Sequence, residues 1–220
     1  MEGVSSESLP AFPALPTIGE EIANAITHGL GALLGIAGLV VLVVRAASEG
    51  TALHVVAAAV YGSSLILLYL VSTLYHALTK GRAKRLFRIL DHCLIYVLIA
   101  GTYTPFTLVT LRGAWGWSLF GAVWGLAVLG VVFKVFFTGR LHVLSTAAYV
   151  LMGWMAVVAI GPLWGALAGP ALAWLVAGGL FYSLGVVFFA SSRRYAHAVW
   201  HLFVLAGSVC HFAVVLRYVV

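Results

Sequence analysis

Charged side chains are scarce in this chain: they make up 8% of its 220 residues, whereas hydrophobic residues make up 63%. Soluble domains do not have this composition, which is typical of a chain that crosses a membrane several times. Cysteines are also few. Cys93 and Cys210 both lie in apolar runs without a C-x-x-C spacing, so we expect neither a disulfide nor a cysteine metal site. Met1–Thr17 has no basic segment followed by an apolar core, which argues against a signal peptide.

Seven apolar segments are each close to the ~20 residues that a helix needs to cross the hydrocarbon core of a bilayer. They run roughly over Ala23–Val44, Leu53–Leu78, Leu90–Leu111, Trp115–Phe137, Leu141–Gly161, Ala171–Ala190 and His197–Tyr218. We therefore predict an all-α integral membrane protein with a seven-transmembrane helix bundle over residues 20–220. Residues 1–19 would form a flexible cytoplasmic tail. Thr102, Thr104 and Pro105 in the third segment predict a local kink.

Basic residues lie at the ends of the apolar segments rather than in one patch, so we expect membrane lipids as partners and no nucleic acid. One side of the predicted bundle holds nine of them: Lys80, Arg82, Lys84, Arg85, Arg88, Lys134, Arg140, Arg193 and Arg194. The other side holds Arg45, Arg112 and Arg217. The richer side of a membrane protein usually faces the cytoplasm. We therefore predict a multi-pass protein of the inner (plasma) membrane, with a cytoplasmic N-terminus and an external C-terminus.

Acidic residues are rarer still, and Asp91 is the only one within the last six predicted spans. A carboxylate inside a membrane span is costly, so it needs a partner and indicates a functional site by default. His76 near the end of the second span, and His197 and His201 at the start of the seventh, fall at the same depth as Asp91 under the predicted topology. These four residues therefore form the candidate site, towards the cytoplasmic leaflet.

The spacing of His197 and His201 suits two ligands of one metal ion, because residues four apart lie on one face of a helix. His76 would supply a third nitrogen from another helix. Three protein ligands with one water molecule is the pattern of a catalytic zinc site. Asp91 would be either a fourth ligand or, as we prefer, the group that holds the zinc-bound water. Ser72 lies four residues before His76 on the same face and would contact a ligand rather than the metal.

Simpler interpretations exist for each residue taken alone. Asp91 could pair with Arg85 or Arg88 at the membrane surface, and a single histidine in a span is more often hydrogen-bonded than metal-bound. His28 and His142 lie on the same side of the membrane and could contact the ligands of the metal, but we expect them to contact headgroups or a loop instead. Trp200 would point away from the ligand face and serve packing. The convergence of a carboxylate with three histidines favours the metal site over these readings.

Several motifs occur together in this chain. They are Glu20–Glu21 with Asn24 and Thr27-His28-Gly29, Ser72-x-x-x-His76, Asp91-His92, Gly101-Thr-Tyr-Thr-Pro105, and His197-x-x-x-His201. With them the chain resembles the progestin and adipoQ receptor family, and within it the bacterial hemolysin III branch, from Glu20 to Val220. The resemblance implies seven spans with the N-terminus inside, zinc bound by the three histidines, and an aspartate hydrogen-bonded to the zinc-bound water. Eukaryotic relatives are linked to ceramide hydrolysis.

Three functions are compatible with these residues. The first is an intramembrane zinc hydrolase that cleaves a lipid amide or ester taken from the bilayer, with Asp91 as the general base. The second is a non-enzymatic sensor or regulator of membrane lipids in which zinc is structural. The third, suggested by the name of the bacterial branch, is a cytolysin, but the spans lack the polar stripe that lines a pore. A cavity at the zinc with room for an acyl chain would distinguish the first from the second.

Overall fold

The computed structural model describes residues 16–220, and within that range the chain consists of helices joined by short connections and contains no strand. Seven helical units are long and apolar enough to cross a membrane. They are α1 (Ile18–Glu49), α2 (Ala52–Ala77), α3 (Arg82–Pro105) with η1 (Phe106–Leu111), α4 (Gly113–Phe137), α5 (His142–Gly153) with η2 (Trp154–Ala159) and α6 (Ile160–Ala166), α7 (Gly169–Phe189), and α8 (Ala196–Val214) with η3 (Val215–Val219). The predicted all-α fold with seven spans is confirmed. The predicted N-terminal tail lies almost entirely outside the described residues.

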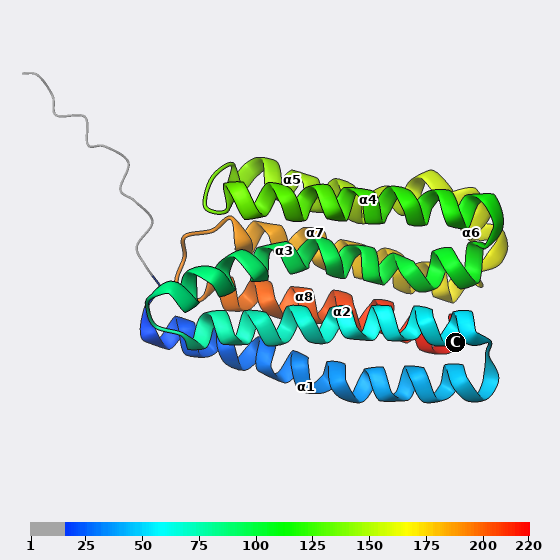
Figure 1. Ribbon diagram of the computed structural model, residues 1–220, viewed down its shortest axis with the longest axis horizontal. Helices are drawn as coiled ribbons and strands as arrows, with labels where there is room; N and C mark the ends of the chain where they lie inside the picture. The colour runs from blue at the N-terminus through cyan, green and yellow to red at the C-terminus, as the bar shows by residue number, and fades with distance from the viewer. Residues whose placement is uncertain (1–15) are drawn as a thin grey trace, which may run out of the picture.

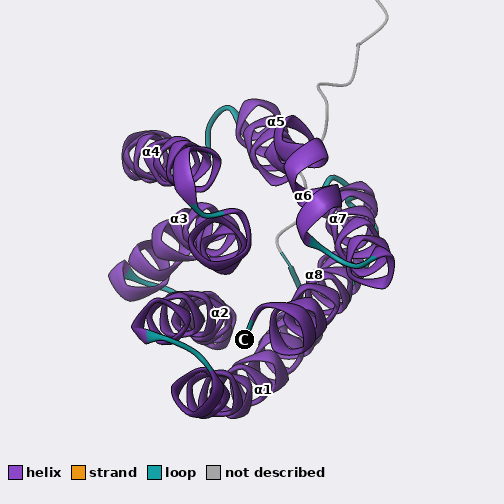
Figure 2. Ribbon diagram, turned by 90° about the vertical axis from the view of Figure 1, so that its right-hand side faces the viewer, coloured by secondary structure: helices purple, strands orange, loops and turns teal. Residues whose placement is uncertain are grey.

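The helices follow one another around a ring, and α8 closes it by packing between α7 and α1 (Figure 2). Helix α1 also packs along α2, and α2 packs along α3. Direct backbone contact between α2 and α8 is sparse, because α1 lies against both of them. The first and last spans are therefore neighbours, which brings residues from the two ends of the sequence to one place.

Close approach of α1 to its neighbours depends on a glycine. A Cβ atom on Gly31 would lie 2.7 Å from Cδ2 of Leu205 on α8 and 3.0 Å from Cγ of Tyr69 on α2. Small residues at such positions let transmembrane helices approach closely where lipid offers no hydrophobic driving force. Gly31 therefore helps to hold α1 against the two helices that carry the candidate histidines.

The irregularity expected in the third span occurs at its far end. The α-helix ends at Pro105, and the chain continues as the π-helical segment η1. Thr102 and Thr104 donate side-chain hydrogen bonds to the carbonyl oxygens of Leu98 and Ala100, at 2.8 and 2.9 Å. These bonds stabilise the turn before the proline, whose missing N–H forces the change in helical geometry.

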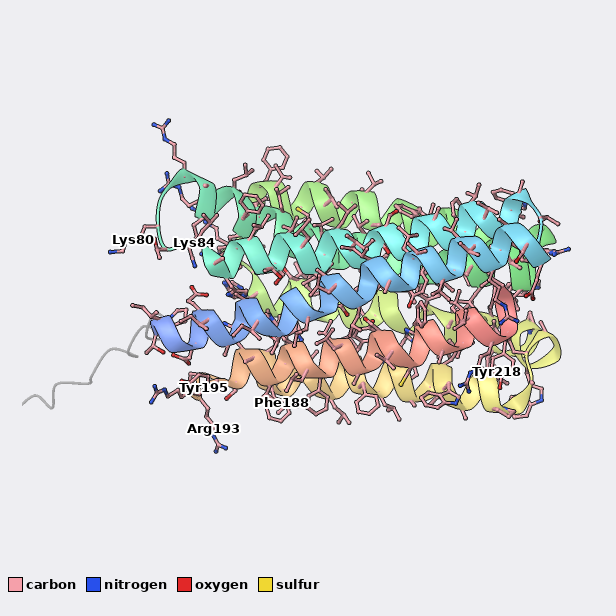
Figure 3. All side chains as sticks on the ribbon, turned by 90° about the horizontal axis from the view of Figure 1, so that it is seen from below. Lys80, Lys84, Phe188, Arg193, Tyr195 and Tyr218 are labelled. Atoms are coloured by element: carbon pink, nitrogen blue, oxygen red, sulfur yellow. The ribbon has the colours of Figure 1, made fainter. Side chains whose placement is uncertain are left out.

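The basic ends of the helices gather at one end of the bundle. The α2–α3, α4–α5 and α7–α8 connections lie together at the end where the described chain begins (Figure 1). Lys80, Lys84 and Arg193 lie at this end, whereas Tyr218 lies at the opposite end (Figure 3). The asymmetry of basic residues is thus present in the folded bundle, and its orientation across the membrane stays a prediction.

Candidate metal centre

Three histidines from α2 and α8 meet near the basic end of the bundle. One ring nitrogen from each of His76, His197 and His201 lies within 4.8 Å of the other two. The ring centroids are 5.1 Å apart for His76 and His197, 5.2 Å for His76 and His201, and 4.7 Å for His197 and His201. His76 and His201 are buried and His197 is half-buried. The structure thus brings together the three histidines that the sequence singled out as metal ligands.

Within residues 16–220, the same ring nitrogen has no hydrogen-bond partner in all three histidines. Among the described residues, Nε2 of His76, His197 and His201 is buried and has no hydrogen-bond partner. Nδ1 of His76 lies 2.6 Å from Oε2 of Glu21, and a carboxylate only accepts. Nδ1 of His201 lies 3.2 Å from the carbonyl oxygen of Asn24. With hydrogen on Nδ1, a neutral ring keeps a lone pair on Nε2.

A buried nitrogen without a hydrogen-bond partner is costly, and three such nitrogens on grouped histidines are explained by a shared ligand. Three neutral imidazoles are a donor set that suits zinc, with the fourth position left to water or substrate. The residues present therefore fit the metal that the sequence pattern indicates.

Asp91 lies beside this centre rather than within it. The group of ligand atoms that share the 4.8 Å separation contains the three histidines and not Asp91. The Asp91 side chain is buried, with Ser72 and His76 as close polar neighbours. Its nearest basic nitrogen within ion-pair range is Nδ1 of His92, at 3.7 Å. In the described part of the chain it forms no ion pair with Arg85 or Arg88, so the simpler reading of a surface ion pair is not supported.

The expectation that His28 contacts headgroups or a loop is wrong. His28 is only 1% exposed and stacks on His201, with ring centroids 3.4 Å apart and planes at 10°. Its Nδ1 lies 2.7 Å from Oγ of Ser72. Ser72, which we expected to contact a ligand of the metal, therefore contacts His28. Packing of α1 against α8 brings this histidine into the centre. The signal in the sequence was its spacing from Asn24, four residues earlier on the same helical face and also buried.

Helix α1 contributes further polar groups that the sequence reading did not assign to the site. The Glu21 carboxylate contacts His76 through one oxygen and, through the other, Nζ of Lys84 at 2.6 Å. Oγ1 of Thr27 lies 3.0 Å from Nδ1 of His201. No spacing rule identifies these residues, because they act on histidines of other helices.

Trp200 was expected to point away from the ligand face and to serve packing. Its ring does pack against neighbouring side chains, but these include the ligand histidines. Its ring lies 4.9 Å from that of His197 and 4.6 Å from that of Phe189, measured between centroids. It also lines the cavity beside the centre. Trp200 and Phe189 therefore shield the histidines on the α7 side with apolar surface.

A largely apolar cavity begins beside the three histidines and runs along the bundle. Asp91, His28 and Trp200 line its start, and Tyr103, Gly179 and His211 line it farther along α3, α7 and α8. From Asp91 to Tyr103 the lining of α3 extends over about 18 Å, at 1.5 Å per helical residue. Most of the other lining residues are aliphatic or aromatic. The buried carboxylate of Asp91 and the unpartnered Nε2 of His28 thus lie at one end of an elongated apolar cavity.

Comparison with known proteins gives a family match over most of the chain. The model of the family described as "Haemolysin-III related" matches residues 17–212. The chain is 53% identical to "Hemolysin-3" of Bacillus cereus over 201 residues, which cover 91% of this chain and 92% of that protein. It is 49% identical to "Hemolysin-3 homolog" of Bacillus subtilis (strain 168) over 205 residues, covering 93% and 96%.

A more distant similarity reaches beyond bacteria. The chain is 28% identical to the "Monocyte to macrophage differentiation factor" of Homo sapiens over 210 residues, which cover 92% of this chain and 86% of that protein. No solved structure matches the chain. The matched region includes all the residues of the candidate centre.

Proposed function

The chain belongs to the Haemolysin-III related family of multi-pass membrane proteins, and we propose that it is a zinc-dependent hydrolase of a lipid amide or ester. One observation carries the proposal. Three histidines, each with a buried and unpartnered Nε2, group together beside an apolar cavity that is lined by a buried carboxylate. Ligand nitrogens, a proton acceptor and a space for an apolar chain are the parts that such a reaction needs.

His76, His197 and His201 would hold the metal. Zinc bound there would polarise the carbonyl group of the substrate and lower the pKa of water at the open position. Asp91 would accept a proton at a carboxylate oxygen from the attacking water and return it to the leaving amine or alcohol. Ser72 and His28 would keep the polar end of the cavity ordered through their mutual hydrogen bond.

The cavity supports a lipid rather than a water-soluble substrate. The hydrocarbon core of a bilayer is about 30 Å thick, so one lipid chain occupies about 15 Å. The cavity lining along α3 extends over about 18 Å, which is similar to that length, and an acyl chain lying along it would bring its carbonyl group near Asp91. We propose that the substrate comes from the plasma membrane and that the polar product leaves towards the cytoplasm.

The test is release of fatty acid by the purified full-length protein from a panel of ceramides, acyl amides and phospholipids. Asp91→Asn keeps the size of the side chain and removes the proton acceptor. General-base catalysis is worth ~10²–10⁴-fold in rate, so release should fall by that factor. Glu49→Gln is the matched control, because Glu49 pairs with Arg45 on the surface at 3.4 Å and lies outside the centre. Absence of release, or equal release by Asp91→Asn and the wild type, would refute the hydrolase.

Two other functions have a specific observation in their favour. A lipid sensor with structural zinc is favoured by the placement of the histidines on α2 and α8, which zinc would join; it predicts zinc binding without fatty-acid release. A cytolysin is favoured by the names of the two bacterial relatives. It predicts dye leakage from vesicles on addition of the purified protein. The apolar lining of the cavity favours the hydrolase over a water-filled pore.

A further inference from the structure

One face of the first turns of α1 is turned towards the candidate centre, although α1 contributes none of the three grouped histidines. Glu21, Asn24 and His28 lie at spacings of three and four residues and so share that face. Each of them lies beside a residue of α2 or α8: Glu21 and Asn24 beside His76, and His28 beside His201. The start of α1 therefore acts as a polar cover over the centre.

We propose that Glu21, held in place by Lys84, is a positioning residue that fixes the orientation of His76 for zinc and increases its affinity for the metal. The inference rests on the zinc site of the proposed function and assigns a role to a residue outside the three grouped histidines. It does not depend on which substrate, if any, is cleaved.

The contact between Glu21 and His76 has the geometry of a strong hydrogen bond. Oε2 of Glu21 lies 2.6 Å from Nδ1 of His76, at the short end of charge-assisted bonds. The His76 side chain is 4% exposed and that of Glu21 is 18% exposed, so water screens the contact little. A ring that donates from Nδ1 to a carboxylate presents Nε2 to a metal and becomes the more basic ligand.

Lys84 sets the position of the carboxylate from the other side. Its Nζ lies 2.6 Å from Oε1 of Glu21, 2.8 Å from the carbonyl oxygen of Leu78 and 3.2 Å from that of Tyr75. The last two oxygens belong to the C-terminal end of α2, whose carbonyl groups have no partner in the helix. Lys84 thus ties Glu21 to the end of the same helix that carries His76.

The other hydrogen-bonded ligand is oriented differently. Nδ1 of His201 meets the carbonyl oxygen of Asn24 and the hydroxyl of Thr27. These acceptors are neutral, whereas Glu21 is charged. Glu21 therefore makes the charged contact between α1 and these ligand histidines, and a single substitution at Glu21 removes that charge.

Zinc affinity of the full-length protein in detergent, measured by competition with a chromophoric chelator, tests the proposal. Glu21→Ala should weaken zinc binding by about 10–100-fold, the usual effect of removing a carboxylate behind a ligating histidine. Glu21→Gln should lie between Glu21→Ala and the wild type, because its amide oxygen still accepts from Nδ1. Lys84→Met should lose less than Glu21→Ala, because the carboxylate is still present.

Glu20→Gln is the matched control. Glu20 is the neighbouring residue, but its carboxylate accepts from the backbone N–H groups of Thr17 and Tyr195, outside the centre. Its zinc affinity should equal that of the wild type. Cobalt(II) in place of zinc gives a second readout, because its visible absorption reports ligand geometry. That spectrum should change in Glu21→Ala and not in Glu20→Gln.

The outcomes separate this inference from the proposal on which it rests. A wild-type protein that binds no zinc would overturn both. If the wild type binds zinc, and Glu21→Ala binds it equally tightly and gives the same cobalt spectrum, the role of Glu21 is overturned and the zinc site is not. A lower melting temperature of the metal-free Glu21→Ala protein, with unchanged zinc affinity, would assign Glu21 to fold stability instead and would equally overturn it.

Discussion

Removal of zinc should destabilise the bundle, and the structure indicates where. Helices α2 and α8 make little direct backbone contact, and away from the histidines they are linked by hydrogen bonds from Tyr61 and Tyr69 to Ser208. Zinc bound to His76 on α2 and to His197 and His201 on α8 would join these two helices directly. Because the unfolded chain does not hold the three histidines together, binding would stabilise the folded state alone.

The size of the effect follows from mass action. At a free zinc concentration 100 times the dissociation constant, binding adds about 2.7 kcal/mol to the free energy of unfolding. Each further tenfold rise in zinc adds about 1.4 kcal/mol. The melting temperature of the purified protein should therefore rise steadily with the logarithm of zinc concentration and fall when a chelator is added.

Thermal unfolding in detergent, monitored over a zinc titration, is the assay. His201→Ala should abolish the dependence on zinc. His54→Ala is the control, because His54 lies at the start of α2 and accepts from the backbone N–H of Thr51, away from the three histidines. If the melting temperature responds to zinc equally in His201→Ala and in the wild type, or if confirmed metal loss from the wild type causes no shift, the reasoning is refuted.

Two further predictions concern orientation and the role of the carboxylate. Reporter fusions should place Met1 in the cytoplasm and Val220 outside, because nine basic residues lie on one side and three on the other; a cytoplasmic reporter at Val220 would contradict this topology. Asp91→Ala should retain most of the zinc in metal analysis of the purified protein, because Asp91 does not belong to the group of ligand atoms formed by the histidines; complete loss of metal would make it a direct ligand.

The seven spans could be read from the sequence because the bilayer permits few solutions. A chain in hydrocarbon must satisfy its backbone hydrogen bonds within each segment, so long apolar runs become helices. The prediction erred at the helix ends: α3 begins at Arg82, where a span beginning near Leu90 was expected. Helices continue beyond the hydrocarbon into the interface, where charged residues such as Lys84 are tolerated, and hydrophobicity alone does not detect that extension.

The three histidines could also be anticipated. His197 and His201 share a helical face by their spacing, and His76 lies at the same predicted depth. His28 was misjudged and Glu21 was not assigned a role in the site, because depth and spacing say nothing about which face of α1 turns towards α2 and α8. That rotation depends on side-chain packing, such as the close contacts of Gly31.

By itself the sequence determined the membrane environment, the number of spans and the identity of the three grouped histidines. Each of these follows from local composition and helical periodicity, which act within a single segment. Only the tertiary structure decided that α1 supplies His28 and Glu21 to the centre, that Asp91 lies beside the three histidines, and that an apolar cavity leads away from them. These features are contacts between helices far apart in the sequence, and they depend on how α8 closes against α1 when the bundle packs.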